Sequence, residues 1–205
     1  ELAASRLSVL IGGAGTGKTT LLSILCSSPQ ISNGGVLLLA PTGKARVRMS
    51  QAFDARHVQF EAKTVAQFLC RTHFDGRTMR YHLSDRDVQG VPATVIIDEC
   101  SMLTEEMFGC LLQALKKAQR IIFVGDPNQL PPIGAGRPFF DLVQKMRTAV
   151  ISAFPRVGTG FAELTVTMRQ TAEDGDVRGD AELAKWFTDA SGDLDDDIFI
   201  QLEGN

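Results

Sequence analysis

Residues 11–20, IGGAGTGKTT, decide the fold that we expect for this chain of 205 residues. Four glycines precede one lysine here, directly after an apolar run, and Gly12, Gly17, Lys18 and Thr19 fit the pattern G-x-x-x-x-G-K-[ST]. Glycines let backbone N–H groups turn inward around an anion, and a helix that follows adds the positive end of its dipole. The stretch therefore predicts a phosphate-binding loop between a buried strand and a helix.

The loop predicts a site for a nucleoside triphosphate and Mg²⁺. Lys18 is expected to reach the β- and γ-phosphates, and Thr19 is expected to offer its hydroxyl to Mg²⁺. The alternative is a glycine-rich turn that merely precedes Lys-Thr, which the strand-like and helix-like flanks disfavour. The residues predicted to bind the nucleotide are Gly12, Gly13, Ala14, Gly15, Thr16, Gly17, Lys18, Thr19 and Thr20.

Apolar runs without polar alternation recur along the chain, and most are followed by helical patterns. The strand-like runs are residues 6–12, 35–40, 93–99, 120–126 and 162–168, and the helical patterns are 18–28, 43–53 and 104–118. They predict an α/β fold with a parallel sheet covered by helices on both faces, in which ligands gather at the carboxyl ends of the strands. Residues 71–90 interrupt the alternation with an Asp-Gly turn and predict a small β-hairpin insertion.

Two acids and one glutamine follow later strands of this predicted sheet. Asp98 and Glu99 come directly after the run at 93–97, so both should emerge at the same sheet edge as the phosphate-binding loop. Asp98 is suited to hold Mg²⁺, and Glu99 to orient and deprotonate an attacking water; a solvated turn is the alternative. Gln129, in the stiff proline-rich stretch 124–136, is expected to sense the γ-phosphate or the water.

Composition bounds the class of protein. With 44% apolar residues and no run near the ~18 that a membrane span needs, the sequence predicts one soluble, cytoplasmic domain without membrane association. Four cysteines without a C-x-x-C pair predict buried reduced thiols rather than zinc or disulfides.

Charge is unevenly distributed along the chain. Residues 1–170 hold 19 Lys and Arg against 13 Asp and Glu, whereas residues 171–205 hold 2 against 11. The basic stretch 44–86 could attract a polyanion or be a solvated face.

Six segments, in this order, resemble the motifs of superfamily-one class B DNA helicases, especially the RecD-like and TraA-type ATPases. They are GGAGTGKTT, LLLAPTGKARVRM, TVAQFL, VIIDECSML, VGDPNQLPPIGAGRPF and LTVTMRQ, and they span residues 7–170. The resemblance implies a RecA-like P-loop NTPase domain over residues 1–170, the first motor domain of two in a helicase. Residues 171–205 would then be an acidic segment that leads toward a second RecA-like domain.

The resemblance also implies roles for single residues. ATP and Mg²⁺ are the implied cofactors, with Lys18, Glu99, Gln129 and Arg169 as catalytic residues and Thr19 and Asp98 as metal ligands. Arg169 would reach the γ-phosphate. Single-stranded DNA is the implied partner, and its expected contacts are Pro41, Thr42, Gly43, Lys44, Arg46 and Thr64. The hairpin at 71–90 lies where RecD-like helicases insert a strand-separating pin, although a plain surface hairpin is the alternative.

The expected function is that of the ATP-hydrolysing first motor domain of a 5′-to-3′ DNA helicase in repair or recombination. In the full-length protein it would couple hydrolysis to translocation along single-stranded DNA and to unwinding at junctions with duplex. The isolated chain is expected to be weakly active, because a second domain normally supplies an arginine to the site. Three alternatives stay open: a conjugative relaxase ATPase, an RNA helicase, and a nucleotide-binding scaffold without turnover.

Overall fold

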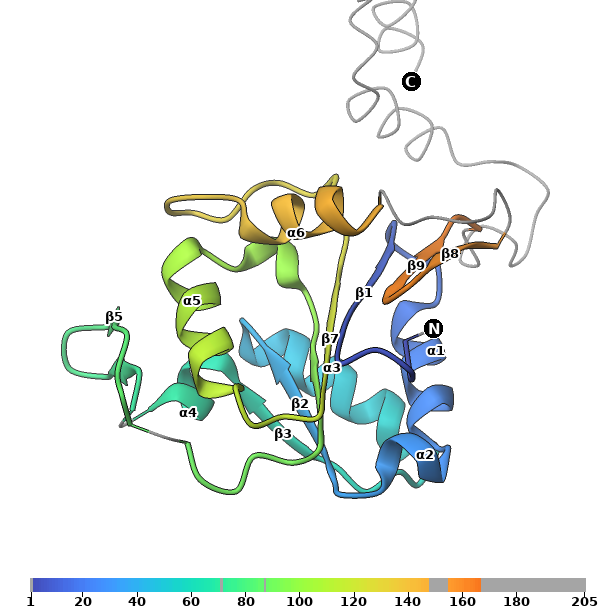
Figure 1. Ribbon diagram of the computed structural model, residues 1–205, viewed down its shortest axis with the longest axis horizontal. Coiled ribbons are helices and arrows are strands. Elements are labelled where there is room, and N and C mark those ends of the chain that lie inside the picture. The colour runs from blue at the N-terminus through green and yellow to red at the C-terminus, as the bar shows by residue number, and fades with distance from the viewer. Residues whose placement is uncertain (1, 71, 87, 148–154, 167–205) are drawn as a thin grey trace, which may run out of the picture. The chain divides into compact units, whose positions relative to one another are not determined.

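A seven-stranded sheet forms the centre of the computed structural model, which describes residues 2–70, 72–86, 88–147 and 155–166 (Figure 1). All of them belong to one compact unit, Glu1–Met168. The strands run in the order β3-β2-β6-β7-β1-β9-β8, and every neighbouring pair is parallel except β8 with β9. The strands are β1 (Leu7–Gly12), β2 (Val36–Ala40), β3 (Glu61–Thr64), β6 (Thr94–Ile97), β7 (Arg120–Gly125), β8 (Arg156–Gly158) and β9 (Phe161–Leu164).

Helices cover both faces of this sheet, which confirms the predicted α/β class. Alternate residues of the central strands belong to two separate apolar clusters, one on each face, because successive side chains of a strand point to opposite sides. The helices α1 (Lys18–Cys26), α2 (Pro29–Ser32) and α3 (Gly43–Asp54) supply buried residues to one cluster. The helices α4 (Val65–Leu69), α5 (Glu105–Ala114) and α6 (Pro138–Arg147) supply the other.

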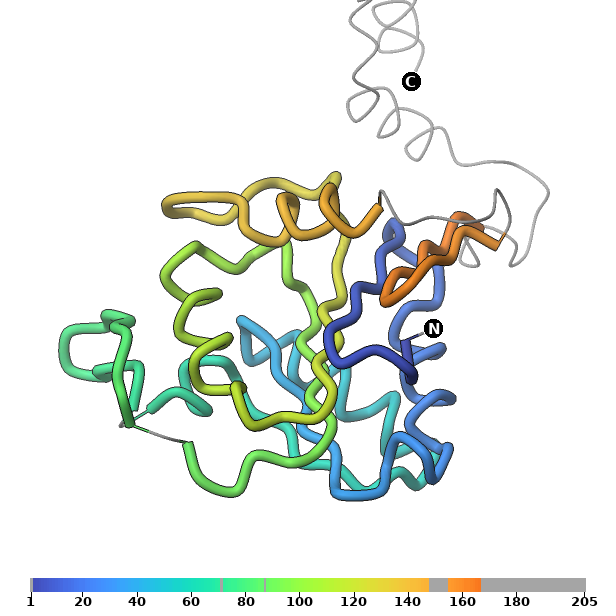
Figure 2. The backbone as a smooth tube through the Cα atoms, in the orientation of Figure 1, coloured from blue at the N-terminus to red at the C-terminus, as the bar shows by residue number. Residues whose placement is uncertain are grey.

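The direction in which the chain crosses the sheet reverses between the neighbouring strands β1 and β7 (Figure 2). After β1 the chain crosses to β2 and β3 at one end of the sheet, then returns through β6 to β7, which pairs with β1. After β7 it crosses in the opposite sense to β9 and β8. Connections that leave two adjacent parallel strands in opposite directions open a crevice at their carboxyl ends. The glycine-rich loop follows β1 at the carboxyl end of this pair of strands.

Several elements differ from the sequence-based prediction, including the short helices α2 and α4, which were not predicted. The edge strand β3 has the sequence EAKT. A search for apolar runs does not detect it, because Glu61 and Lys63 are charged. The short β8 makes one antiparallel edge on a sheet that was predicted to be parallel throughout. The helix α6 was not predicted, although buried Phe139 and Val143 stand one helical turn apart. Thr104 begins α5 as expected, by accepting a hydrogen bond from the N–H of Met107, but the helix ends at Ala114.

The predicted hairpin at 71–90 is present. Its strands β4 (Phe74–Asp75) and β5 (Arg80–Tyr81) are antiparallel, and the rings of Phe74 and Tyr81 lie 4.7 Å apart between centroids. The hairpin is attached to α5, because the N–H of Ser84 donates to the side-chain carbonyl of Gln113 at 3.0 Å and both rings pack against the cluster that includes α5. The role of a strand-separating pin stays a prediction.

Two further expectations concern the thiols and the membrane. Cys26, Cys100 and Cys110 are buried and free, as predicted, whereas Cys70 is exposed, so that part of the prediction was wrong. Cys70 directly follows the short helix α4 and ends its buried run at Leu69. Within the described part of the chain, the helices are too short or too polar to cross a bilayer.

His73, at the base of the hairpin, makes folding sensitive to acid. The side chain is fully buried, and burial lowers the pKa of its imidazole below 6.5. The unfolded chain therefore binds a proton at higher pH than the folded chain, so the stabilisation is complete above about pH 6.5 and is lost as the pH falls below that value. We expect the urea concentration at the unfolding midpoint to decrease when the pH is lowered from 7 to 5. His73→Gln should reduce the slope of this midpoint against pH. Replacing exposed His57 by Gln should leave it unchanged; equal slopes in all three proteins would contradict the assignment.

Candidate nucleotide-binding site

The glycine-rich loop is a tight turn that leads directly into α1. Gly15 and Gly17 have φ values of 77° and 86°, in the left-handed region that suits glycine, and Gly17 is the residue from which α1 begins. The hydroxyl of Thr16 donates to the carbonyl of Gly13 at 2.9 Å and closes the loop on itself. Among the described residues, no side chain caps the start of α1. The amides of its first turn, which includes Thr19 and Thr20, are thus available to an anion.

Position 12 requires glycine because neighbouring atoms lie too close for a side chain, and not because its φ is positive. A Cβ at this position would lie 2.6 Å from Oγ1 of Thr16 and 2.8 Å from the carbonyl oxygen of Leu164 on β9. We therefore expect Gly12→Ala to lower the free energy of unfolding by about 1–3 kcal/mol and to distort the loop. Gly13→Ala is the matched control, because its Cβ would meet nothing closer than 4.0 Å. Urea unfolding of both variants tests this, and equal stability of the two would contradict it.

Lys18 holds the loop and faces acidic groups. Its ammonium donates to the carbonyls of Gly12 at 2.6 Å and Gly13 at 2.8 Å. Burial lowers the pKa of Lys18, and the negative charges of Asp126, Asp98 and Glu99 oppose this effect, in that order of size. Three carboxylates from two neighbouring strands therefore lie within electrostatic reach of the ammonium. This arrangement is the one that the sequence predicted for the loop and the acidic pair.

The acidic pair stands at the end of β6, on the same sheet edge. The N–H of Asp98 continues the sheet by donating to the carbonyl of Leu39, and its carboxylate accepts the N–H of Glu99, both at 2.9 Å. Asp98 is buried, and its pKa is raised, chiefly because burial disfavours the charged form. A cation beside this carboxylate would stabilise its charged form. Carboxylate and hydroxyl oxygens are the ligand types that Mg²⁺ takes together with phosphates, so Asp98 and Thr19 fit the metal.

Glu99 adopts a backbone conformation that is rare for a residue with a side chain. Its φ and ψ are 54° and 40°, in the left-handed region, and the 3₁₀ turn η1 (Cys100–Met102) begins directly after it. The side chain keeps 26% of its surface exposed, and its Oε1 lies 3.9 Å from a guanidinium nitrogen of Arg48 on α3. The strand end thus fixes the backbone of Glu99 while its carboxylate stays open to solvent.

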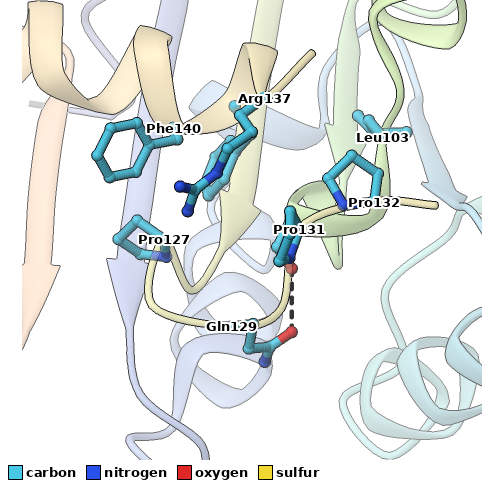
Figure 3. Close-up of a pocket in the computed structure, with 9 residues that line it drawn as sticks. Leu103, Pro127, Gln129, Pro131, Pro132, Arg137 and Phe140 are labelled. Carbon is cyan, nitrogen blue, oxygen red and sulfur yellow. Dashed lines mark hydrogen bonds between the residues drawn. The ribbon is translucent and has the colours of Figure 1, made fainter. Parts of the chain in front are cut away.

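Gln129 lies in the proline-rich loop after β7 and is joined to the turn after Glu99. Its side-chain oxygen accepts a hydrogen bond from the hydroxyl of Ser101 at 3.0 Å, and its N–H donates to the carbonyl of Asp126. Figure 3 shows the hollow beside it, which prolines and the stacked pair of Arg137 and Phe140 line; the guanidinium lies 4.5 Å from the ring centroid. The loop is therefore stiff and in contact with the strand end that carries the acidic pair.

Asp126 is a residue of this site to which the sequence analysis gave no role. It follows β7 directly, is buried, and accepts the N–H of Asn128 at 3.0 Å. Its charge is the strongest of those that raise the pKa of Lys18. The signal was present in the sequence, because Asp126 follows an apolar run in the same way that Asp98 does.

The residues predicted to contact nucleic acid lie on the same edge, beside the acidic pair. Thr42 caps α3 by accepting the N–H of Ala45, and Thr64 caps α4 by accepting the N–H of Gln67, each at 3.2 Å. Ala40 pairs with Thr64 across β2 and β3, so the two threonines follow neighbouring strand ends. Pro41 and Gly43 flank Thr42, and the side chains of Lys44 and Arg46 extend from the first turns of α3.

The cap at Thr64 could have been found in the sequence. The side chain of Gln67 accepts the N–H of Thr64 at 2.9 Å and completes a reciprocal capping box. The pattern T-x-x-Q is the signal for this arrangement. Thr64 therefore has a structural role besides its predicted contact with nucleic acid, and its hydroxyl hydrogen can still be donated.

The sheet order shows which predicted residues come together. In the order of the strands across the sheet, the carboxyl edge carries Thr64 at the end of β3, Thr42 after β2, Asp98 after β6, Gln129 after β7, and the phosphate-binding loop after β1. The predicted nucleotide and nucleic-acid residues thus occupy adjoining parts of one edge. Arg169 lies outside the described residues.

Comparison with known proteins identifies the family. A sequence profile described as AAA domain matches residues 1–189. The RecD subunit of the RecBCD enzyme from Mycolicibacterium smegmatis is 30% identical over 208 residues, which cover 91% of this chain and 36% of that protein. The ATP-dependent RecD2 DNA helicase of Deinococcus radiodurans is 34% identical over 149 residues, which cover 72% of this chain and 19% of that protein. This chain therefore spans about a third or less of these relatives.

A solved structure agrees with the fold. Bacteroides sp Pif1 in complex with ADP-AlF4 superposes with a TM-score of 0.51 at 21% identity, over 83% of this chain and 40% of that one. This similarity confirms the RecA-like P-loop NTPase fold. The profile match and the sequence relatives show that the chain belongs to the AAA domain family, as a helicase ATPase domain of the superfamily-one, RecD-like kind.

Proposed function

We propose that this chain binds and hydrolyses Mg·ATP as the first motor domain of a 5′-to-3′ DNA helicase. The observation that carries the proposal is the position of Lys18, whose ammonium holds the phosphate-binding loop and lies in the field of Asp98, Glu99 and Asp126. ATP as the nucleotide and the 5′-to-3′ direction come from the likeness to RecD-type helicases rather than from this geometry.

The residues divide the chemistry among themselves. The open amides of α1 and the ammonium of Lys18 bind the phosphates and stabilise the charge that develops on them. Thr19 and Asp98 would hold Mg²⁺, which would supply positive charge that stabilises the phosphates. Glu99 accepts the proton of the attacking water, and Gln129 orients that water or the γ-phosphate. Arg169 would add a guanidinium at the γ-phosphate.

Single-stranded DNA is the proposed second ligand, and it would lie across the ends of β2 and β3. The hydroxyls of Thr42 and Thr64 accept hydrogen bonds in their caps, but each can still donate its proton to a phosphate. Lys44 and Arg46 add charge beside them, and Pro41 and Gly43 shape the chain there. Translocation, unwinding at a junction and the contribution of a second RecA-like domain belong to the same proposal.

Binding assays with the 205-residue chain test this proposal. We expect fluorescent ATP to bind only with Mg²⁺ present, phosphate release to be slow, and oligo-dT to speed that release. Oligo-dT should bind more tightly than oligo-U of the same length, and its affinity should fall with added salt as phosphate contacts require. Preference for oligo-U would favour an RNA helicase, and nucleotide binding without any release would favour a scaffold; either result would contradict the proposal.

A further inference from the structure

Arg48 is a charged residue near the site for which the proposed function has no role. It lies on α3, whose buried face consists of Ala45, Met49 and Phe53. Arg48 points away from this face, and its side chain is 58% exposed. Lys44, one helical turn earlier, is exposed too, and residues four apart on a helix are neighbours on its surface. One face of α3 therefore carries two cations in a row, starting at the end predicted to bind DNA.

The guanidinium of Arg48 reaches the proposed reacting centre. One of its nitrogens lies 3.9 Å from Oε1 of Glu99. Its charge also lowers the pKa of Asp98 and of Lys18, so it lies within electrostatic range of both. Among the described residues, Arg48 is the only ion-pair partner of Glu99. The helix that begins at Thr42 is thereby connected to the residue proposed as general base.

This ion pair is suited to orientation rather than to stability. An ion pair between solvent-exposed side chains contributes little to folding, because water screens it and both side chains lose freedom. The N–H of Glu99 is held by its hydrogen bond to Asp98, whereas none of the hydrogen bonds among the described residues involves its carboxylate. Arg48 is the group that can select one position of the Glu99 carboxylate.

We propose that Arg48 is a positioning residue that holds the carboxylate of Glu99. The strength of this contact between Arg48 and Glu99 depends on nucleic acid bound at the start of α3. Lys44 and Arg48 are like charges four residues apart on one helix face, an arrangement that disfavours their close approach. A phosphate of a bound strand near Lys44 offsets this repulsion and steadies Arg48 against Glu99. The inference rests on the proposed function and adds to it a link between the two sites.

Kinetics of three variants of the 205-residue chain test this link. At saturating oligo-dT we expect Arg48→Ala to lower kcat about fivefold, the size of an exposed charge interaction, and to leave KM for ATP within about twofold. Arg48→Lys should recover part of the loss, because it keeps the charge. Arg56→Ala is the control, since Arg56 is an exposed arginine just beyond the end of α3. Thermal unfolding should show the same midpoint for Arg48→Ala and the unmodified chain.

The outcomes separate this inference from the proposed function. If the unmodified chain neither binds Mg·ATP nor releases phosphate, the proposed function fails and the inference fails with it. If the unmodified chain is active and Arg48→Ala keeps its kcat and its stimulation by oligo-dT, only the inference is overturned. A raised KM with unchanged kcat would also overturn it, because Arg48 would then serve nucleotide binding.

Discussion

Replacing Lys18 by alanine is expected to reduce kcat/KM for ATP hydrolysis by about 10²–10³, the usual cost of removing a preorganised group that stabilises transition-state charge. The ammonium already lies at the loop, within hydrogen-bond distance of the carbonyls of Gly12 and Gly13, so little reorganisation is needed when phosphates arrive. Phosphate release and binding of fluorescent ATP measure the effect.

Lys18→Met separates charge from packing. Methionine keeps most of the aliphatic stem but removes the ammonium that faces Asp98, Glu99 and Asp126. We expect it to lose as much activity as Lys18→Ala while unfolding at a similar temperature to the unmodified chain. ATP binding of ordinary affinity in both variants would mean that the phosphates bind somewhere other than this loop.

Glu99→Gln is expected to retain Mg·ATP binding and to lose hydrolysis by about 10²–10⁴, the range that a general base contributes. Glutamine preserves the shape of the side chain and its left-handed backbone site but cannot take a proton from water. Affinity for fluorescent ATP and the single-turnover rate of phosphate release distinguish the two effects.

Glu106→Gln is the matched control for this variant. Glu106 is an exposed acid in the first turn of α5, and its loss should change neither affinity nor rate. Near-normal turnover in Glu99→Gln would exclude Glu99 as the base. A large loss of affinity would instead give Glu99 a role in binding the metal or the nucleotide.

Much of this fold could be predicted because its central strands are buried on both faces. Runs such as VLLLA in β2 and RIIFVG in β7 have no polar alternation, which is typical of strands in a parallel sheet that is covered on both faces. The strands at the two edges of the sheet, β3 and β8, do not show this apolar pattern. Glu61 and Lys63 make β3 look like a loop, and the three-residue β8 is too short for any periodicity. Edge strands are specified by their partners, which a single sequence does not show.

Parts of the candidate site could be predicted where a single short motif contains both the reactive side chains and the residues that set the local backbone. The glycine-rich loop and the pair Asp98-Glu99 are of this kind. Arg48 is different, because its proximity to Glu99 depends on the pairing of β2 with β6, which brings α3 beside a strand that is distant in sequence. Asp126 could have been noticed at its strand end, but its effect on Lys18 follows from the pairing of β7 with β1.

The most direct test of the central claim is a crystal structure with a non-hydrolysable ATP analogue and Mn²⁺, whose anomalous signal marks the metal. We predict that the γ-phosphate accepts a hydrogen bond from the ammonium of Lys18, and that the metal lies between the hydroxyl of Thr19 and the carboxylate of Asp98. A triphosphate bound away from residues 12–19, or an anomalous peak distant from Asp98, would contradict the account.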